Sequence, residues 1–267
     1  MDYSHCKALR IELDDGIATL TINRPEARNA IDREIHEELD DIWLDLAADD
    51  AVKVIILTGA GTSFSAGGDL KRLAERAGTD EGQQFLMGLP GHGRRLLNNI
   101  LEVQKPIIAA INGDAIGLGA TLALVCDITV MSSEARIGDP HVRVGVSAGD
   151  GGSVIWPLLV GPSRAKEYLM LGLLASGQEA ERMNLVNHVV APDEVMPKAI
   201  DLARKLAELP PWAVRYTKAT INMSVRAQFA QAMDASLAYE ALTMSTGDFG
   251  EGTRAFLERR KPKFTGR

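Results

Sequence analysis

The chain has 267 residues, of which 46% are hydrophobic and 24% charged, and its formal net charge is −7. This length and composition are typical of a globular protein with a full hydrophobic core. The net negative charge argues against nucleic acid or an anionic membrane as the main partner, because phosphate binding requires concentrated positive charge.

The first half of the chain predicts alternating strands and helices. Residues 9–13 and 17–22 alternate apolar and polar side chains around Asp14-Asp15-Gly16, which indicates a β-hairpin. Asp32 is a candidate cap for a helix that continues to about residue 48. Further expected elements are strands at 52–58, 106–112 and 127–131 and a helix from Gly117. This alternation predicts an α/β fold.

The rest of the chain is predicted to be loop and helix. Residues 72–101 contain several glycines and a proline, and we expect a loop plus a helix there, with a mobile stretch at 88–93. Beyond residue 193 the apolar stripes are helical, at 195–209, 213–224 and 229–245. We therefore divide the chain into a core, residues 1–195, and a C-terminal helical region, residues 196–267.

Two glycine-rich turns carry the strongest functional signal. Residues 63–70, Ser-Phe-Ser-Ala-Gly-Gly-Asp-Leu, follow the apolar run 54–57. Residues 116–120, Ile-Gly-Leu-Gly-Ala, follow the run 106–113. Each reads as a strand, a glycine turn and a helix start, an arrangement that leaves backbone N–H groups free to bind an anion or a developing oxyanion. Together the two turns predict the two donors of an oxyanion hole.

Four further segments, spread along the chain, also resemble motifs of one known family. They are Asn-Arg-Pro-Glu-Ala-Arg-Asn-Ala at 23–30, Cys-Asp-Ile at 126–128, Leu-Val-Asn-His-Val-Val at 185–190 and Phe-Leu-Glu-Arg-Arg-Lys-Pro-Lys-Phe at 256–264. With the two turns, they resemble the crotonase superfamily, the enoyl-CoA hydratase/isomerase family. The resemblance implies a spiral of β-β-α repeats followed by helices that build a homotrimer, and trimers in this family often pair into hexamers.

The resemblance also implies the substrate and its binding residues. The expected substrate is an acyl-CoA thioester that reacts through an enolate, with no cofactor beyond coenzyme A as part of the substrate. By motif position, the oxyanion donors are the backbone N–H groups of Ala66 and Leu118. The residues expected to contact the substrate or its coenzyme A are Arg28, Ala30, Ser65, Gly67, Asp69, Leu70, Gly117, Thr121, Lys261 and Phe264.

The acid/base residues depart from the family pattern. Hydratases of this family use two glutamates, and Thr121 and His141 stand at those positions here. Threonine is not a general base near neutral pH without an activating neighbour. Asp150 is the compensating candidate: it lies nine residues after His141, and a carboxylate can orient an imidazole and stabilise its charged form. The alternatives are a turn or helix-cap role for Asp150 and a structural histidine at 141.

Three functions follow from these residues. The first is an enoyl-CoA hydratase/isomerase-class enzyme with atypical acid/base residues. The second is a hydrolase of a carbon–carbon bond or a thioester, or a dehalogenase, using Asp150 and His141. An aspartate at this turn resembles the aryl-CoA dehalogenases and diketone hydrolases, although no tryptophan lies near His141. The third is a non-catalytic acyl-CoA-binding paralogue. The absence of the glutamate pair is consistent with this hypothesis.

The remaining candidates have simpler interpretations. His92 and Arg94 could reach a pocket, but we expect them in a solvated loop. Glu240 is expected to be structural on a C-terminal helix, although the resemblance includes relatives that bring a C-terminal acid into the site. The cysteines predict no disulfide framework, and the His, Cys and acid spacings predict no metal site. The first residues do not resemble a signal peptide and no apolar run reaches membrane-spanning length, so we expect a cytoplasmic enzyme.

Overall fold

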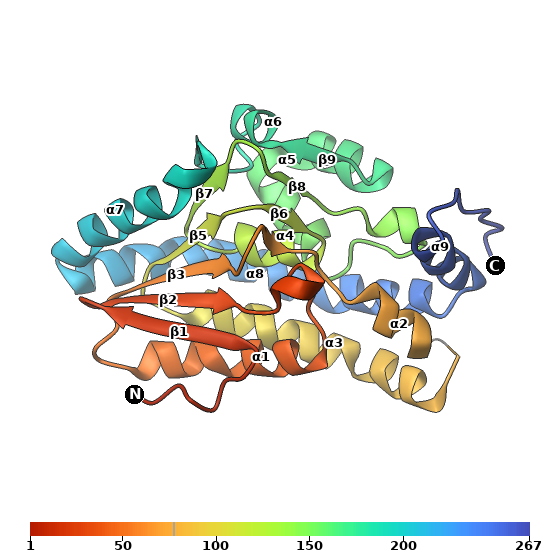
Figure 1. Cartoon of the computed structure of the whole chain (residues 1–267), viewed down its shortest axis with the longest axis horizontal. Helices are drawn as coiled ribbons and strands as arrows, with labels where there is room; N and C mark the ends of the chain where they lie inside the picture. The colour runs from red at the N-terminus through yellow and green to blue at the C-terminus, as the bar shows by residue number, and fades with distance from the viewer. Residues whose placement is uncertain (77) are drawn as a thin grey trace.

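The computed structural model describes residues 1–76 and 78–267, and two β-sheets form its centre (Figure 1). The larger sheet has the strand order β1-β2-β3-β5-β7-β10 and the smaller one β4-β6-β8-β9. The strands of the larger sheet are β1 (Leu9–Asp14), β2 (Ile17–Ile22), β3 (Val54–Gly59), β5 (Ile107–Ile111), β7 (Ile128–Ser132) and β10 (His188–Val190). Those of the smaller sheet are β4 (Ser63–Ser65), β6 (Asp114–Ile116), β8 (Arg136–Gly138) and β9 (Leu174–Ser176).

Successive strands alternate between the two sheets. β3 is followed by β4, β5 by β6 and β7 by β8, and β3, β5 and β7 are parallel neighbours, as are β4, β6 and β8. At least one α-helix follows each of these consecutive strand pairs. This is the spiral of β-β-α repeats that the sequence predicted.

Helices surround the sheets on both sides (Figure 1). They are α1 (Arg33–Ala48), α2 (Leu70–Arg76), α3 (Asp80–Glu102), α4 (Leu118–Leu124), α5 (Gly152–Leu171), α6 (Gly177–Arg182), α7 (Val195–Glu208), α8 (Pro211–Met244) and α9 (Gly247–Leu257). Short 3₁₀ turns occupy η1 (Pro25–Ala27), η2 (His141–Val144) and η3 (Pro192–Glu194). Within the described residues, none of the helices combines the length and apolar character that crossing a bilayer requires.

The larger sheet is buried on both faces, which explains its continuous apolar strands. Ile55 and Leu57 of β3 belong to the main core with α1 and α3, whereas Val54 and Ile56 face the opposite way and pack with α7. Successive side chains of a strand point to opposite faces, so both sets must be apolar. The predicted cap of α1 is also present, since Oδ1 of Asp32 accepts a hydrogen bond from the N–H of Ile35 at 3.1 Å.

Two sequence predictions about helices were wrong. The stretch 88–93 is not a loop but part of α3, which continues through Pro90. A glycine suits this helix because a side chain at Gly93 would meet Leu237 of α8 at 2.7 Å. The predicted helices at 213–224 and 229–245 are one helix, α8, because the four residues between them include neither glycine nor proline.

Candidate functional site

The candidate site lies at the carboxyl ends of the three parallel strands of the smaller sheet. Strands β4, β6 and β8 end at Ser65, Ile116 and Gly138, and the segments that follow them carry the predicted site residues. Loops at the carboxyl ends of neighbouring parallel strands meet at one edge of a sheet, which is where open α/β sheets bind ligands. A cavity of about 350 Å³ lies at this edge.

The two glycine turns contact each other through their backbones. Gly67 has a φ of +78°, and a Cβ atom there would lie 2.5 Å from the carbonyl oxygen of Ile116. A Cβ atom at Gly119 would in turn lie 2.7 Å from Cβ of Ser65. Only glycine permits such a close approach and such a φ at low cost. The glycines therefore bring two backbone segments, far apart in the chain, to the same wall of the cavity.

The free N–H group of the first turn belongs to Gly68 and not to Ala66. The N–H of Ala66 donates a hydrogen bond to the carbonyl oxygen of Arg28 at 3.0 Å, and Ala66 does not line the cavity. Gly68 lines the cavity, and its N–H has no hydrogen-bond acceptor in the part of the chain that is described. The prediction of Ala66 as a donor is therefore corrected to Gly68, two residues later in the same turn.

The second turn places its donor as predicted. Leu118 lines the cavity and is the first residue of α4, so its N–H has no acceptor within the helix. Gly117 forms the N-cap with a φ of +55°, and a side chain there would meet the ring of His141 at 3.1 Å. The positive end of α4 thus points into the cavity beside Leu118 and His141.

His141 and Asp150 form the pair that the sequence suggested. Nε2 of His141 lies 3.5 Å from Oδ2 of Asp150, and both side chains line the cavity. On the other side of the ring, Nδ1 of His141 is hydrogen-bonded to Oδ1 of Asp139. Thr121 donates its hydroxyl hydrogen to Oδ1 of Asp150 at 3.3 Å. Gly151, not Asp150, occupies the N-cap of α5, although the backbone of Gly152, the first residue of the helix, hydrogen-bonds to Asp150.

The electrostatics of this cluster define its resting state. Burial opposes the charged imidazolium, but the carboxylates of Asp139 and Asp150 outweigh it and raise the pKa of His141 well above its ordinary value. Burial raises the pKa of Asp150 to about 6, against the opposing effect of His141. Near neutral pH the cluster therefore holds an imidazolium whose neighbour, Asp150, is a carboxylate with a basicity greater than that of a free aspartate.

A further acid, Glu240 of α8, enters the same cavity. Its side chain is 7% exposed, and its Oε2 atom is buried without a hydrogen-bond partner. Burial and the nearby charge of Asp150 raise the pKa of Glu240 to about 8. The sequence interpretation of Glu240 as a structural residue does not account for this position, because a packing residue at a buried apolar site needs no ionisable group.

Asp139, His141 and Asp150 offer ligand atoms within 4.8 Å of one another, a spacing that a metal ion could also use. The imidazole already bonds Asp139 through Nδ1 and faces Asp150 through Nε2. Attraction between an imidazolium and two carboxylates is sufficient to explain the cluster.

The family model described as enoyl-CoA hydratase/isomerase matches residues 12–267. The chain belongs to the enoyl-CoA hydratase/isomerase family. It is 36% identical over 255 residues to a crotonyl-CoA hydratase of Syntrophomonas wolfei, covering 95% of this chain and 96% of that protein. It is 37% identical over 256 residues to a short-chain-enoyl-CoA hydratase of Clostridium acetobutylicum, covering 94% and 95% of the two chains.

A solved structure shows the same fold. The enoyl-CoA hydratase/isomerase from Mycobacterium paratuberculosis superposes with a TM-score of 0.87 at 33% identity, covering 92% of this chain and 97% of that one. The predicted family, fold and enzyme class are therefore confirmed. Within this family, the positions of Thr121, His141 and Asp150 still set the acid/base arrangement of this chain apart from the two-glutamate pattern expected of hydratases.

The predicted binding residues near the turns fall into two groups. Asp69 and Leu70 line the cavity, and Asp69 is held by the guanidinium of Arg24 at 2.8 Å. Ser65 and Thr121 are fully buried and do not line the cavity, so they support its wall from behind. The hydroxyl of Ser65 donates to the carbonyl of Asn29 at 2.8 Å and accepts from the N–H of Gly67. The predicted substrate contact of these two residues stays a prediction.

Three other predicted binding residues take part through the backbone or by packing. Arg28 is exposed, and its carbonyl oxygen accepts the N–H of Ala66. Ala30 is 8% exposed, and its carbonyl accepts a hydrogen bond from Arg24 at 3.3 Å. Gly117, described above, packs against His141. The entry segment 23–30 thus braces the first glycine turn from outside the cavity.

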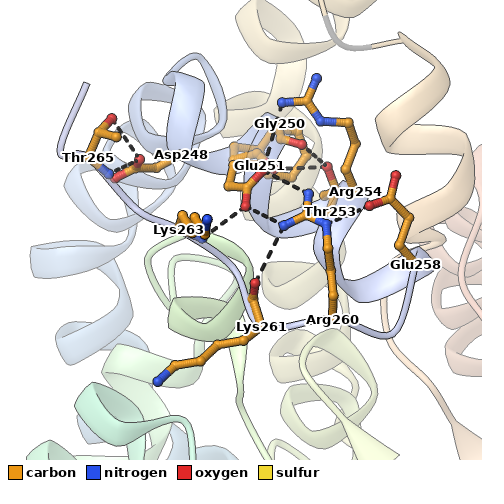
Figure 2. Close-up of polar contacts among 11 residues, drawn as sticks. Asp248, Gly250, Glu251, Thr253, Arg254, Glu258, Arg260, Lys261, Lys263 and Thr265 are labelled. Carbon is orange, nitrogen blue, oxygen red and sulfur yellow. Dashed lines mark hydrogen bonds and ion pairs between the residues drawn. The ribbon is translucent and has the colours of Figure 1, made fainter.

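The C-terminal tail folds back on α9 and does not line the cavity. Figure 2 shows the guanidinium of Arg260 between Glu251, at 2.6 Å, and Glu258, with the side chain of Lys261 pointing away from them. Phe264 is 45% exposed. Lys261 and Phe264 are therefore available to a ligand or a second chain outside the cavity, and their predicted contact with coenzyme A stays a prediction.

Sequence reasoning assigned no role in the site to four residues that contribute to it. Gly68 was overlooked because the motif does not show which N–H is already bonded. Asp139 stands two residues before His141 and could have been flagged as its partner. Glu240 interrupts an apolar helical stripe, which was the available signal. His92 lies on α3 and lines the cavity, whereas Arg94 pairs at the surface with Asp234.

Proposed function

We propose that the protein processes an enoyl-CoA or related acyl-CoA thioester through an enolate, with Asp150 as the base. One observation carries the proposal: the N–H groups of Gly68 and Leu118 face the same cavity as the His141–Asp150 pair. Enolate chemistry requires donors at the thioester oxygen and a base at the neighbouring carbon, and both are present in one site.

The residues divide the work of proton transfer. The thioester oxygen would accept hydrogen bonds from Gly68 and Leu118, each worth roughly 10²–10³ in rate when it acts on a developing oxyanion. Asp150 would remove the α- or γ-proton, or a proton from water during hydration. His141, held charged by Asp139, would keep Asp150 ionised and in place. These steps use only proton transfer and hydrogen bonds, so they need no cofactor besides the coenzyme A of the substrate.

The cavity wall supports an apolar acyl group. Beside the polar cluster it is lined by a continuous set of apolar side chains from α2, α3, η2, α8 and α9, namely Leu70, Leu73, Phe85, Leu89, Val144, Met244 and Phe249. Burial of apolar surface contributes about 25 cal/mol for each Å² removed from water, so this wall would hold a hydrocarbon chain.

We also propose that the chain assembles as a homotrimer or a pair of trimers. Large apolar side chains on α8 remain exposed, with Trp212 at 58%, Tyr216 at 57% and Met223 at 71%. An exposed apolar surface of this kind marks a protein interface. Light scattering of the purified protein at several concentrations would test the proposal, and a monomer at all concentrations would contradict it.

The function is tested by two assays on the wild-type protein and Asp150→Asn. One follows loss of the enoyl absorbance of crotonyl-CoA, and the other follows α-proton exchange of butyryl-CoA in deuterated water. We expect exchange and turnover in the wild type and a loss of about 10²–10⁴-fold in both for the variant. Absence of exchange in the wild type would contradict enolate chemistry and favour a binding paralogue. Release of free coenzyme A from either thioester would favour a hydrolase, and halide release from a halogenated acyl-CoA, assayed separately, would favour a dehalogenase.

A further inference from the structure

The carboxyl group of Glu240 lines the cavity but has no role in the proton transfers proposed for Asp150. Glu240 lies in the C-terminal half of α8, where the other buried side chains are apolar: Phe229, Met233, Leu237 and Met244. The spacing of three and four residues places all five on one face of the helix. An isolated carboxyl group on such a face costs stability unless it is neutral or paired. The chain nevertheless keeps an acid where leucine or methionine would fit.

Nothing in the described residues compensates for this burial. None of their ion pairs or side-chain hydrogen bonds involves the carboxyl group of Glu240, and its Oε2 atom is orphaned. The charged groups that face it are the carboxylates of Asp139 and Asp150 and the imidazolium between them. Two anions and one cation leave the surroundings of Glu240 negative overall, so the neutral carboxylic acid is the favoured form.

The position of Glu240 beside Asp150 is fixed by the packing of the turn at 147–151 on α8. A Cβ atom at Gly149 would lie 2.8 Å from Oε2 of Glu240, so only glycine leaves room for the carboxyl group next to Asp150. Hydrogen bonds hold the two ends of the turn to the same helix. The N–H of Ser147 donates to Oγ1 of Thr243 at 3.1 Å, and the hydroxyls of Ser153 and Ser236 are 2.6 Å apart.

From this geometry we infer that Glu240 is the catalytic acid that protonates the carbon end of the enolate. The inference rests on the proposed function and adds a second proton-transfer residue to it. It divides the chemistry between two carboxyl groups: Asp150, backed by an imidazolium, takes a proton, and Glu240, buried without a partner, supplies one. Glu240 comes from a helix distant in sequence and replaces the missing second acid of the family pattern.

The step balances as a proton transfer. The enolate electron pair forms a new C–H bond, the O–H bond of Glu240 breaks, and its electron pair stays on the carboxylate. In isomerisation, Asp150 has already gained the proton lost by the other carbon. In hydration, Asp150 has gained the proton of the attacking water, whose oxygen has bonded to the β-carbon. In both cases one carboxyl group ends protonated and the other ionised, and a proton passing from Asp150 to Glu240 restores the resting state.

The experiment compares the wild type with Glu240→Gln, which keeps the size of the side chain but has no transferable acid proton. Asp234→Asn is the matched control, because it makes the same acid-to-amide change on the solvent side of α8. Each protein is assayed for α-proton exchange of butyryl-CoA, for hydration of crotonyl-CoA and for isomerisation of a β,γ-enoyl-CoA. Circular dichroism verifies folding, and infrared difference spectra between acidic and alkaline pH detect the protonated acid.

We expect Glu240→Gln to keep α-proton exchange within about threefold, since Asp150 alone can remove and return that proton. Hydration and isomerisation should fall by about 10²–10⁴-fold, the range for removal of a general acid. The loss of activity at alkaline pH, where Glu240 ionises, should disappear from the residual rate. The infrared band of the carboxylic acid with a pKa of about 8 should be missing from this variant, and Asp234→Asn should behave as the wild type.

If the wild type is active and Glu240→Gln has the same rates of hydration and isomerisation, this inference is overturned and the proposed function remains intact. An equal fall of exchange and turnover would also overturn it, because Glu240 would then only position Asp150. A wild-type protein without any exchange would overturn the proposed function and the role of Glu240 together.

Discussion

Nε2 of His141 lies 3.5 Å from Oδ2 of Asp150, although the chain passes through η2 and a glycine turn between them. The contact is directional, because Asp139 binds the other ring nitrogen and orients the imidazole toward Asp150. An imidazolium between two carboxylates thus stands where the hydratases of this family are expected to carry a glutamate. The following changes test how the site depends on this arrangement.

Thr121→Val should move the acidic limb of the kcat/KM profile to higher pH. The hydroxyl of Thr121 donates to Asp150 at 3.3 Å and so stabilises its ionised form. Burial raises the pKa of Asp150 to about 6, and losing this donor should raise it further. The measurement is kcat/KM against pH with crotonyl-CoA. Thr121→Ser, which keeps the hydroxyl, is the control, and a limb that coincides in all three proteins would refute the prediction.

Asp139→Asn should lower the pKa of His141. Burial disfavours the imidazolium, and the carboxylate of Asp139 makes the largest contribution that offsets this effect. Because the folded-state pKa is raised, the stabilisation is complete below the unfolded value of 6.5 and is lost as pH rises through the folded value. Relative to the wild type, the free energy of unfolding of the variant should therefore fall most below pH 6.5 and less at alkaline pH.

NMR titration of labelled histidine measures the pKa of His141 in Asp139→Asn, and urea unfolding at acidic and alkaline pH measures the stability of the variant. Asp45→Asn is the control, because it breaks a surface pair in which Nε2 of His5 lies 3.3 Å from the carboxylate. Exposed pairs of this kind contribute about 0–1 kcal/mol, so the control should change little. A His141 pKa that is the same in Asp139→Asn and the wild type would show that Asp139 does not hold the charge.

Two adjacent glycines should respond differently to alanine. In Gly68→Ala the new methyl would meet only Leu73, at 3.6 Å, and the backbone N–H would remain, so activity should persist. In Gly67→Ala the methyl would lie 2.5 Å from the carbonyl oxygen of Ile116, at a φ of +78°. The two turns would separate, and we expect a fall of about 10²-fold in kcat, as for loss of one oxyanion donor. Equal activities of the two variants would contradict this account of the turns.

Glu240→Met should make the protein more stable, and more so at pH 8 than at pH 4.5. Burial raises the pKa of Glu240 from 4.5 to about 8, so its neutral form is favourable in the folded state. That contribution is complete below the unfolded pKa and is lost as pH rises through the folded pKa. Removing the acid should therefore gain on the order of 1–3 kcal/mol at the higher pH.

Denaturant unfolding of Glu240→Met at both pH values measures this gain. Asp234→Met is the control, because an exposed site on the same helix should change stability by about 0.5 kcal/mol or less. Gains that are equal at the two pH values would indicate that Glu240 does not titrate between them in the folded protein.

The sequence by itself determined the local structure and the family. Apolar periodicity placed the hairpin, the strands of the larger sheet other than β10, and most helices, because burial on one or both faces dictates the pattern of side chains. The paired glycine turns indicated an oxyanion site, since their backbone geometry depends on the residues themselves. The joint loss of glutamates at 121 and 141 and the acid at 150 indicated the His141–Asp150 pair.

Only the tertiary structure decided which groups are free to react. The N–H of Ala66 is bonded to Arg28, so the donor is Gly68, and neither fact can be read from the turn alone. Glu240 reaches Asp150 because Gly149 lets α8 approach the turn, a contact between segments about ninety residues apart in sequence. Hydrogen bonding and burial depend on neighbours from distant segments, and they determine which donors are available and which acids are neutral.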